Sequence, residues 1–242
     1  GSFPGRPSEP TAENCRSLAK LVASTDADLG IAHDGDADRM RAVTAGGEFL
    51  SGDVLLALFG RAAATGGDAV AVPVDTSLAV EDHLADAGIE TRRTAVGDVY
   101  VAEAASEAGV AFGGEPSGAW IWPDETLCPD GPLAACRIAE MAAETPLSDR
   151  AAAVETYPIR RDNIETGRKN SVMDAVRERV AEEFGDVSTL DGVRVDLGDG
   201  WFLLRASGTQ PLVRMTAEAR TEQRAAEIAE RAMALLEDAS EG

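Results

Sequence analysis

The run from Asp34 to Arg39 reads Asp-Gly-Asp-Ala-Asp-Arg, with three carboxylates at alternate positions and a guanidinium at the end. The residues between the acids are small, so the three side chains can converge on one point. Converging carboxylates repel each other unless a hard divalent cation lies between them, and oxygen ligands at this density suit Mg²⁺ or Ca²⁺. Arg39 favours phosphate or carboxylate instead. The run therefore predicts a site for a metal and a phosphorylated ligand, with Asp34, Asp36 and Asp38 as the metal ligands.

Other interpretations of the acidic run are an EF-hand, a solvated turn and the active site of a Mg²⁺-dependent phosphatase. An EF-hand counted from Asp34 needs Gly at its sixth position and Glu at its twelfth, whereas this sequence has Arg39 and Ala45 there. A phosphatase of this kind needs a lysine downstream of the acidic run. It is disfavoured because lysine is scarce, with Lys20 and Lys169 the only two in the sequence. The solvated turn stays open, because acidic residues are frequent throughout the chain.

A second candidate loop, Arg205-Ala-Ser-Gly-Thr-Gln-Pro211, lies between two apolar stretches. Gly208 lets backbone N–H groups approach an anion, the hydroxyls of Ser207 and Thr209 can donate, and Arg205 supplies positive charge. The segment predicts a phosphate-binding loop. A plain hairpin turn remains the alternative, because Ser, Gly and Thr are common in turns.

A third candidate loop spans Gly113–Gly118 and reads Gly-Gly-Glu-Pro-Ser-Gly. Glu115 and Ser117 lie on a stiff turn, where a carboxylate and a hydroxyl could bind vicinal hydroxyls of a sugar. Taken alone the pattern is weak, because Gly and Pro mark turns in all proteins.

The residues around these loops predict the elements that would position them. Asp28–His33 reads as a short buried strand that leads into the acidic run. From Asp53 to Met141 helical and strand spacings alternate, which favours a parallel sheet in an α/β layer domain. Ala69–Val74 is a continuous apolar run, typical of a strand covered on both faces. Because ligands bind beyond the carboxyl ends of such strands, Gly113–Gly118 lies where a site is expected.

The last part of the sequence changes character and predicts a small α+β domain. Glu144–Ala153 reads as a linker, and Asn170 or Ser171 can cap a helix. Three strands and an amphipathic C-terminal helix follow, over Val193–Leu197, Trp201–Arg205, Leu212–Ala217 and Thr221–Leu236.

The composition limits the possible partners and location. A net charge of −21 argues against binding to nucleic acid or to anionic membranes. No apolar run approaches the length of a membrane span and no signal pattern is present. The three cysteines are widely spaced, so a reducing cytoplasm is expected. Dispersed acid with few lysines also predicts a halophilic source, because high salt would screen the self-repulsion.

Taken in order, the acidic run, Gly114–Gly118 and Arg205–Pro211 resemble the α-D-phosphohexomutase superfamily, which includes phosphoglucomutase, phosphomannomutase and phosphoglucosamine mutase. The resemblance covers nearly the whole chain and implies three of the family's four domains. Residues 1–48 would be the end of the α/β second domain, residues 49–148 the parallel-sheet α/β third domain, and residues 149–242 the small α+β fourth domain.

The resemblance implies transfer of phosphate between C1 and C6 of a hexose phosphate, through a phosphoserine and a bisphosphorylated intermediate. Asp34, Asp36 and Asp38 would hold Mg²⁺, and Arg39 would neighbour the phosphate on the serine. Glu115 and Ser117 would bind sugar hydroxyls. The phosphate that is not reacting would be held by Arg205, Ser207, Gly208 and Thr209, with Arg214 as a further candidate.

The serine itself belongs to the family's first domain, and no loop resembling Thr-Ala-Ser-His-Asn-Pro occurs in this sequence. We therefore expect this polypeptide alone to be inactive as a mutase. The alternative is a non-catalytic sugar-phosphate-binding protein that naturally lacks the first domain. Asp98 follows Val96-Gly97 as in phosphoglucosamine mutases, where some phosphomannomutases have His. The sequence leaves the choice between glucose, mannose and glucosamine, and the oligomeric state, open.

Overall fold

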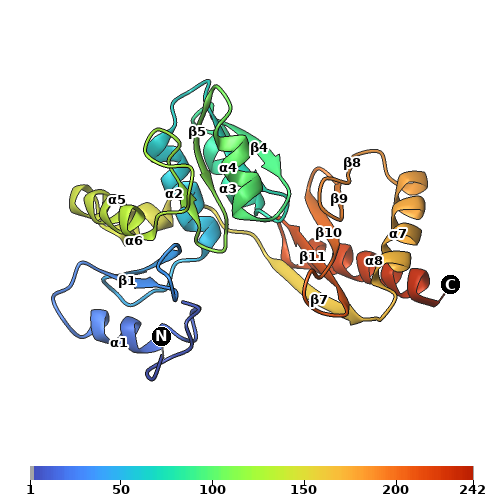
Figure 1. Cartoon of the computed structure of the whole chain (residues 1–242), viewed down its shortest axis with the longest axis horizontal. Helices are drawn as coiled ribbons and strands as arrows, with labels where there is room; N and C mark the ends of the chain where they lie inside the picture. The colour runs from blue at the N-terminus through green and yellow to red at the C-terminus, as the bar shows by residue number, and fades with distance from the viewer. Residues whose placement is uncertain (1–2, 242) are drawn as a thin grey trace. The chain divides into compact units, whose positions relative to one another are not determined.

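The computed structural model describes residues 3–241, which divide into two compact units, residues 1–155 and 156–242. Each unit is described by itself (Figure 1). The proposed boundary at 148/149 falls inside a helix of the first unit, α6 (Leu147–Ala152).

The first unit begins with helix α1 (Arg16–Ala23) packed on an antiparallel hairpin, β1 (Leu29–His33) and β2 (Met40–Thr44). Pairing of His33 with Met40 closes the hairpin, so that the acidic run forms its connecting loop. The predicted strand before the acidic run is confirmed.

A four-stranded sheet in the order β4-β3-β5-β6 forms the middle of the first unit. Strand β3 pairs in parallel with both β4 and β5, which confirms the predicted parallel sheet, and β6 is antiparallel to β5. The strands are β3 (Ala69–Pro73), β4 (Glu90–Thr94), β5 (Val110–Gly114) and β6 (Trp120–Ile121). All five residues of β3 are buried, as expected for a central parallel strand.

Helices cover both faces of this sheet (Figure 1). Helix α4 (Asp98–Ala105) packs its Val101 against Gly113 on one face. On the other face, α2 (Gly52–Ala63) packs Leu56 against Gly114, and α3 (Leu78–Ala85) packs beside α2. The Ser77 hydroxyl caps α3 by accepting a hydrogen bond from the Ala79 N–H at 3.0 Å, as expected of a serine at this position.

The first unit ends with α5 (Gly131–Glu144) and α6. The predicted linker at Glu144–Ala153 is wrong for most of its length, because α6 occupies it. The buried side chain of Leu147 holds this short helix against the rest of the unit. Such a short helix escapes detection in the sequence because six residues carry too little periodicity to be recognised.

The second unit is a five-stranded antiparallel sheet in the order β7-β11-β10-β9-β8, with both helices on one face. The core between sheet and helices is apolar and includes Val176, Phe202, Val213 and Ile228. The elements are β7 (Ile159–Glu165), α7 (Lys169–Glu183), β8 (Val187–Ser188), β9 (Val193–Asp196), β10 (Gly200–Ala206), β11 (Leu212–Ala219) and α8 (Glu222–Glu241).

The α+β prediction for the second unit is confirmed, but the sequence missed strands β7 and β8. Strand β7 reads Ile-Arg-Arg-Asp-Asn-Ile-Glu and is mostly exposed, because it lies at the sheet edge. The segment forms a strand because its backbone pairs with β11, and not because its own side chains are buried. In the described part of the chain, no helix is long and apolar enough to cross a membrane.

Candidate active site

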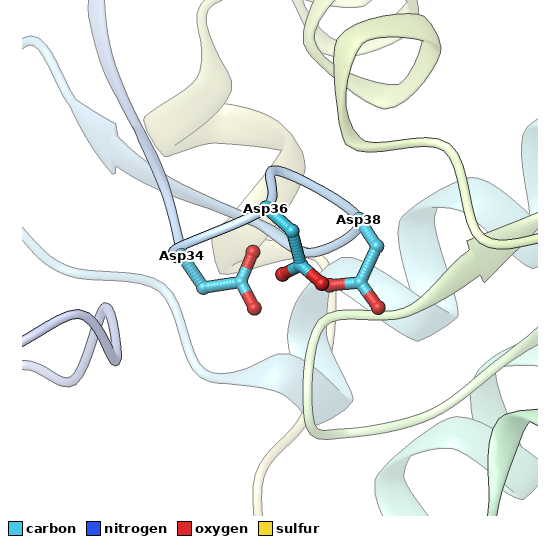
Figure 2. A group of neighbouring side chains, drawn as sticks. All are labelled: Asp34, Asp36 and Asp38. Carbon is cyan, nitrogen blue, oxygen red and sulfur yellow. The ribbon is translucent and has the colours of Figure 1, made fainter. Parts of the chain in front are cut away.

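The acidic loop brings its three carboxylates together at the end of the β1-β2 hairpin (Figure 2). One carboxylate oxygen from each of Asp34, Asp36 and Asp38 lies within 4.8 Å of the others. Ala37 adopts a φ of 62°, a conformation that residues other than Gly, Asn and Asp rarely take. The loop therefore keeps a strained residue at the turn that places the acids on one side.

Arg39 binds the most buried of the three acids. Its backbone N–H donates to Oδ1 of Asp34 at 3.2 Å, and its Nε and Nη2 both lie 2.8 Å from Oδ2. Burial favours the neutral form of Asp34, but the bonds from Arg39 outweigh it and lower the pKa of this carboxyl. Burial and the neighbouring carboxylates Asp34 and Asp36 raise the pKa of Asp38.

These residues fit a hard divalent cation. The Oδ1 atom of Asp38 is enclosed and accepts no hydrogen bond within the described residues, its nearest cation being the Arg39 Nε at 3.6 Å. Three acidic side chains around one point, with an enclosed oxygen lacking a donor, are a donor set that suits a hard cation such as Mg²⁺ or Ca²⁺ and not a soft metal.

Glu9 is a member of this site that the sequence did not reveal. Its Oε1 lies 2.6 Å from Nη1 of Arg39, so the guanidinium is held between Glu9 and Asp34. Glu9 lies 25 positions before the acidic run in a Pro-rich segment, and no local pattern marks it. The start of α5 also faces the loop, because a Cβ on Gly131 would lie 2.4 Å from the Ala37 carbonyl oxygen.

The Glu115 loop leaves the carboxyl end of β5 and holds its acid in place from two sides. Oε1 of Glu115 accepts from the Gly97 N–H at 2.7 Å, and Oε2 accepts from the Ser117 hydroxyl at 3.0 Å. The residue is 8 % exposed, and burial raises the pKa of this carboxyl, although both hydrogen bonds oppose the shift. A carboxylate fixed in this way presents a defined acceptor to a ligand hydroxyl.

The structure places the acidic loop and the Glu115 loop next to each other within the first unit. The Met40 N–H donates to the Gly118 carbonyl at 3.0 Å, and the Trp120 indole N–H donates to the Met40 carbonyl at 3.0 Å. Arg39 and Ala119 form a β-bridge between the same segments. Two loops that are about 80 positions apart in the chain are thus held side by side by hydrogen bonds.

The Arg205 loop belongs to the second unit, where it connects β10 and β11. Ser207 is buried, and its Oγ accepts from the Gln210 N–H at 3.2 Å, which fixes the turn. Gly208 and Thr209 are exposed at the tip. The loop is therefore closed by its own hydrogen bonds while its tip stays open to solvent.

Three cationic side chains surround this loop. Arg205 and Arg214 are directly opposite each other across the β10-β11 pair, and therefore project from the same face of the sheet. Arg205 contacts Asp191 at 3.3 Å, and Arg214 donates to the Gln210 side chain at 3.2 Å. Lys169 donates to the Ser207 carbonyl at 2.5 Å. No local pattern in the sequence marks Lys169 for this site, although the scarcity of lysine was a possible signal.

Three domain models of the phosphoglucomutase/phosphomannomutase family match the chain. They are the α/β/α domain II over residues 1–47, the α/β/α domain III over 51–157 and the C-terminal domain over 160–235. The chain therefore belongs to the α-D-phosphohexomutase superfamily, as the sequence motifs indicated.

Within this family the chain is similar to proteins named phosphoglucosamine mutase. The probable phosphoglucosamine mutase of Methanopyrus kandleri is 48% identical over 234 residues, which cover 94% of this chain and 52% of the relative. That of Methanothermobacter thermautotrophicus is 47% identical over 245 residues, covering 98% and 54%. The chain spans about half the length of the curated relatives it matches.

Solved structures share the fold. A phosphoglucomutase/phosphomannomutase family protein from Burkholderia thailandensis is 27% identical, with a TM-score of 0.85, over 98% of this chain and 52% of that chain. Aspergillus fumigatus N-acetylphosphoglucosamine mutase, solved in complex with GlcNAc-6P and magnesium, is 17% identical with a TM-score of 0.69, covering 96% and 53%. At this low identity the second likeness concerns the fold alone.

Proposed function

We propose that this chain carries the metal, sugar and distal-phosphate sites of a phosphohexomutase that acts on glucosamine phosphate. The observation that carries the proposal is the joining of the acidic loop to the Glu115 loop through Met40, Gly118 and Trp120. The names of the relatives support the choice of glucosamine among the hexoses. Asp98, at the start of α4 beside the Glu115 loop, agrees with that choice.

At the reacting end, Asp34, Asp36 and Asp38 would hold Mg²⁺. The ion would supply positive charge that stabilises the transferring phosphoryl group. Arg39 has a hydrogen-bonding fork aimed at Asp34 and Glu9, and the same fork suits a phosphate oxygen. We infer that Arg39 exchanges one carboxylate partner for the phosphate when substrate is present.

At the sugar, Glu115 would accept hydrogen bonds from hydroxyls and Ser117 would hold Glu115 or donate to the ligand. The Gly97 N–H fixes one carboxylate oxygen, so the direction of the acceptor is set before the sugar binds. Such preorganisation lets binding energy orient the reacting end.

At the far phosphate, Arg205, Ser207, Gly208, Thr209 and Arg214 would form the binding loop. Two arginines on one face of the β10-β11 pair repel each other, and an anion between them would relieve this repulsion. Each charge-assisted hydrogen bond to phosphate would contribute about 1.5–3 kcal/mol.

We also propose that this polypeptide alone has no mutase activity, because it contains no loop that resembles the family's phosphoserine loop. It would act in a reducing cytoplasm, in keeping with its three free cysteines. The alternative of a non-catalytic sugar-phosphate-binding protein makes the same prediction for this polypeptide by itself.

The test is calorimetric titration of the purified chain with Mg²⁺ and then with glucosamine 1-phosphate, glucose 1-phosphate and mannose 1-phosphate. We expect Mg²⁺ to bind and glucosamine 1-phosphate to bind more tightly than the other two. Absence of binding by all three sugars would refute the proposal, and a preference for mannose would refute only its sugar. Turnover of any of them by this polypeptide would contradict the expected inactivity.

A further inference from the structure

Arg41 is a cationic residue of β2 to which neither the sequence nor the proposed function assigns a role. It lies two positions after Arg39 and opposite Ala32 in the hairpin. Its Nη2 donates to the carbonyl of Pro116, which stands between Glu115 and Ser117 in the neighbouring loop. Arg41 therefore contacts the backbone of the one turn that carries both predicted sugar ligands.

Three segments of the first unit meet at the Arg41 guanidinium. A Cβ on Gly52, at the start of α2, would lie 2.4 Å from Nη1 of Arg41 and 1.9 Å from the Pro116 carbonyl oxygen. A Cβ on Gly118 would lie 3.4 Å from Nε. Both positions are glycine because the guanidinium and the loop backbone fill the space that a side chain would need.

The burial of this cation is costly. Its Nη1 is enclosed and has no hydrogen-bond partner among the described residues. Burial lowers the pKa of Arg41 although the charges of Asp53 and Glu9 oppose the shift. Burying a charge without satisfying all of its hydrogen bonds costs free energy, so stability alone gives a weak reason for its presence.

The position of Arg41 connects it mechanically to the acidic loop. Both oxygens of Asp34 accept hydrogen bonds from Arg39, the residue just before the start of β2. A cation bound to Asp34 would share these oxygens with the Arg39 guanidinium, so we expect its charge to weaken the bonds of Arg39 and to shift the start of β2. The other hydrogen bonds between β2 and the Glu115 loop use the backbone of Met40. Arg41, by contrast, bonds to that loop through its side chain.

We propose that Arg41 is a positioning residue that couples divalent-cation binding at the acidic loop to ordering of the Glu115–Gly118 turn. The proposal rests on the proposed function for the metal site and goes beyond it, because it assigns a coupling between two sites. Thermodynamic coupling of this kind commonly amounts to a factor of about 5–150.

The test uses hydrogen exchange of the backbone amides in residues 114–120, with and without Mg²⁺ at a saturating concentration set by calorimetry. In the unsubstituted chain we expect Mg²⁺ to slow this exchange about fivefold or more. In R41M we expect the slowing to disappear while the Mg²⁺ affinity stays within about threefold. The matched control is R61M, which removes the bond from Arg61 on α2 to the His83 carbonyl on α3 and should leave the effect intact.

The outcomes distinguish failure of the coupling role of Arg41 from failure of the proposed metal site. Binding of Mg²⁺ without slower exchange in the unsubstituted chain, or slower exchange that persists in R41M, would overturn the role of Arg41 and leave the metal site standing. No Mg²⁺ binding at all would overturn both. Should R41M fail to fold, R41Q takes its place: the glutamine amide is too short to reach Pro116, so the same loss is expected, and full slowing in R41Q would overturn the proposal.

Discussion

The backbone N–H of Gly97 donates to Oε1 of Glu115 at 2.7 Å. Gly97 follows β4 and Glu115 follows β5, and these strands are separated in the sheet by β3. The hydrogen bond therefore spans the carboxyl edge of the sheet and ties two of its loops together. Gly97 adopts a φ of 136°, which only glycine takes readily, so the residue that makes this contact cannot easily be replaced.

The buried state of Glu115 predicts a pH effect on stability. Because its pKa is raised in the folded protein, the folded state holds this proton at pH values where the unfolded chain has lost it. The contribution of Glu115 to the free energy of unfolding is therefore fully present below the ordinary pKa of a glutamate and is lost as the pH rises through the raised value.

Substitution E115Q should remove that contribution. The unfolding free energies of E115Q and of the unsubstituted chain, measured by denaturant titration from pH 4 to pH 8, should differ with a pH-dependent slope. Parallel curves would show that Glu115 titrates normally. E125Q, at an exposed position, is the control and should follow the unsubstituted chain.

Loss of one proposed metal ligand should weaken Mg²⁺ binding. Substitution D36N keeps the shape of an exposed side chain and removes one of the three charges. We expect the Mg²⁺ dissociation constant to rise about 10–100-fold or more, because changes to residues outside the ligand shell already have effects of this size. Calorimetry measures it. D26N changes an exposed acid outside the loop and controls for net charge; an equal loss in D26N would mean that Mg²⁺ binds nonspecifically.

Close packing at Gly52 predicts a severe effect of a single methyl group. Substitution G52A would bring Cβ against the Pro116 carbonyl and the Arg41 guanidinium, so the loop must move. We expect a loss of about 3 kcal/mol in unfolding free energy, at the upper end for overpacking. In G46A the new Cβ meets only the Thr44 hydroxyl at 3.9 Å, and this control should be nearly neutral. Similar unfolding midpoints for both variants would contradict the argument.

The phosphate loop predicts an effect of Arg214 on ligand affinity. Because R214M removes one charge-assisted donor worth about 1.5–3 kcal/mol, affinity for a hexose 1-phosphate should fall about tenfold or more. Titration calorimetry at constant salt measures it. R179M, on an exposed face of α7 where Arg179 pairs with Asp238, is the control and should bind normally. Unchanged affinity in R214M would remove Arg214 from the site.

The net charge of −21 predicts stabilisation by salt. Screening shortens the range of repulsion to about 3 Å at 1 M. We expect the thermal midpoint to rise by several degrees between 0.1 M and 2 M KCl, with about 2–4 °C for each kcal/mol in a chain of this size. A matched series in sucrose, which strengthens apolar burial without screening charges, separates the effect of burial from the effect of screening. An equal or larger rise in sucrose, or no rise in KCl, would argue against the halophilic interpretation.

Several parts of the fold could be predicted from local sequence because their signals are local. The apolar run of β3 and the alternation of helix and strand predicted the parallel sheet. The acidic run predicted the convergence of its three carboxylates, because they stand at alternate positions with small residues between them. The order of the three loops then identified the family.

Other parts depend on contacts that the local sequence does not contain. Strand β7 carries exposed polar residues and becomes a strand because β11 offers it hydrogen bonds across about 50 positions of sequence. Helix α6 is too short to show a period. Glu9, Lys169 and Arg41 join their sites through bonds to residues 30, 38 and 75 positions away.

The sequence by itself determined which side chains could do the chemistry, because charge, size and spacing are properties of the chain. The tertiary structure decided which of them act together. Folding of β2 against the Glu115 loop put the acids and the proposed sugar-binding residues side by side, and it buried Glu115 and the Arg41 guanidinium deeply enough to shift both pKa values. Burial and proximity arise only when distant segments pack, and they are what turn residues of suitable chemistry into a site.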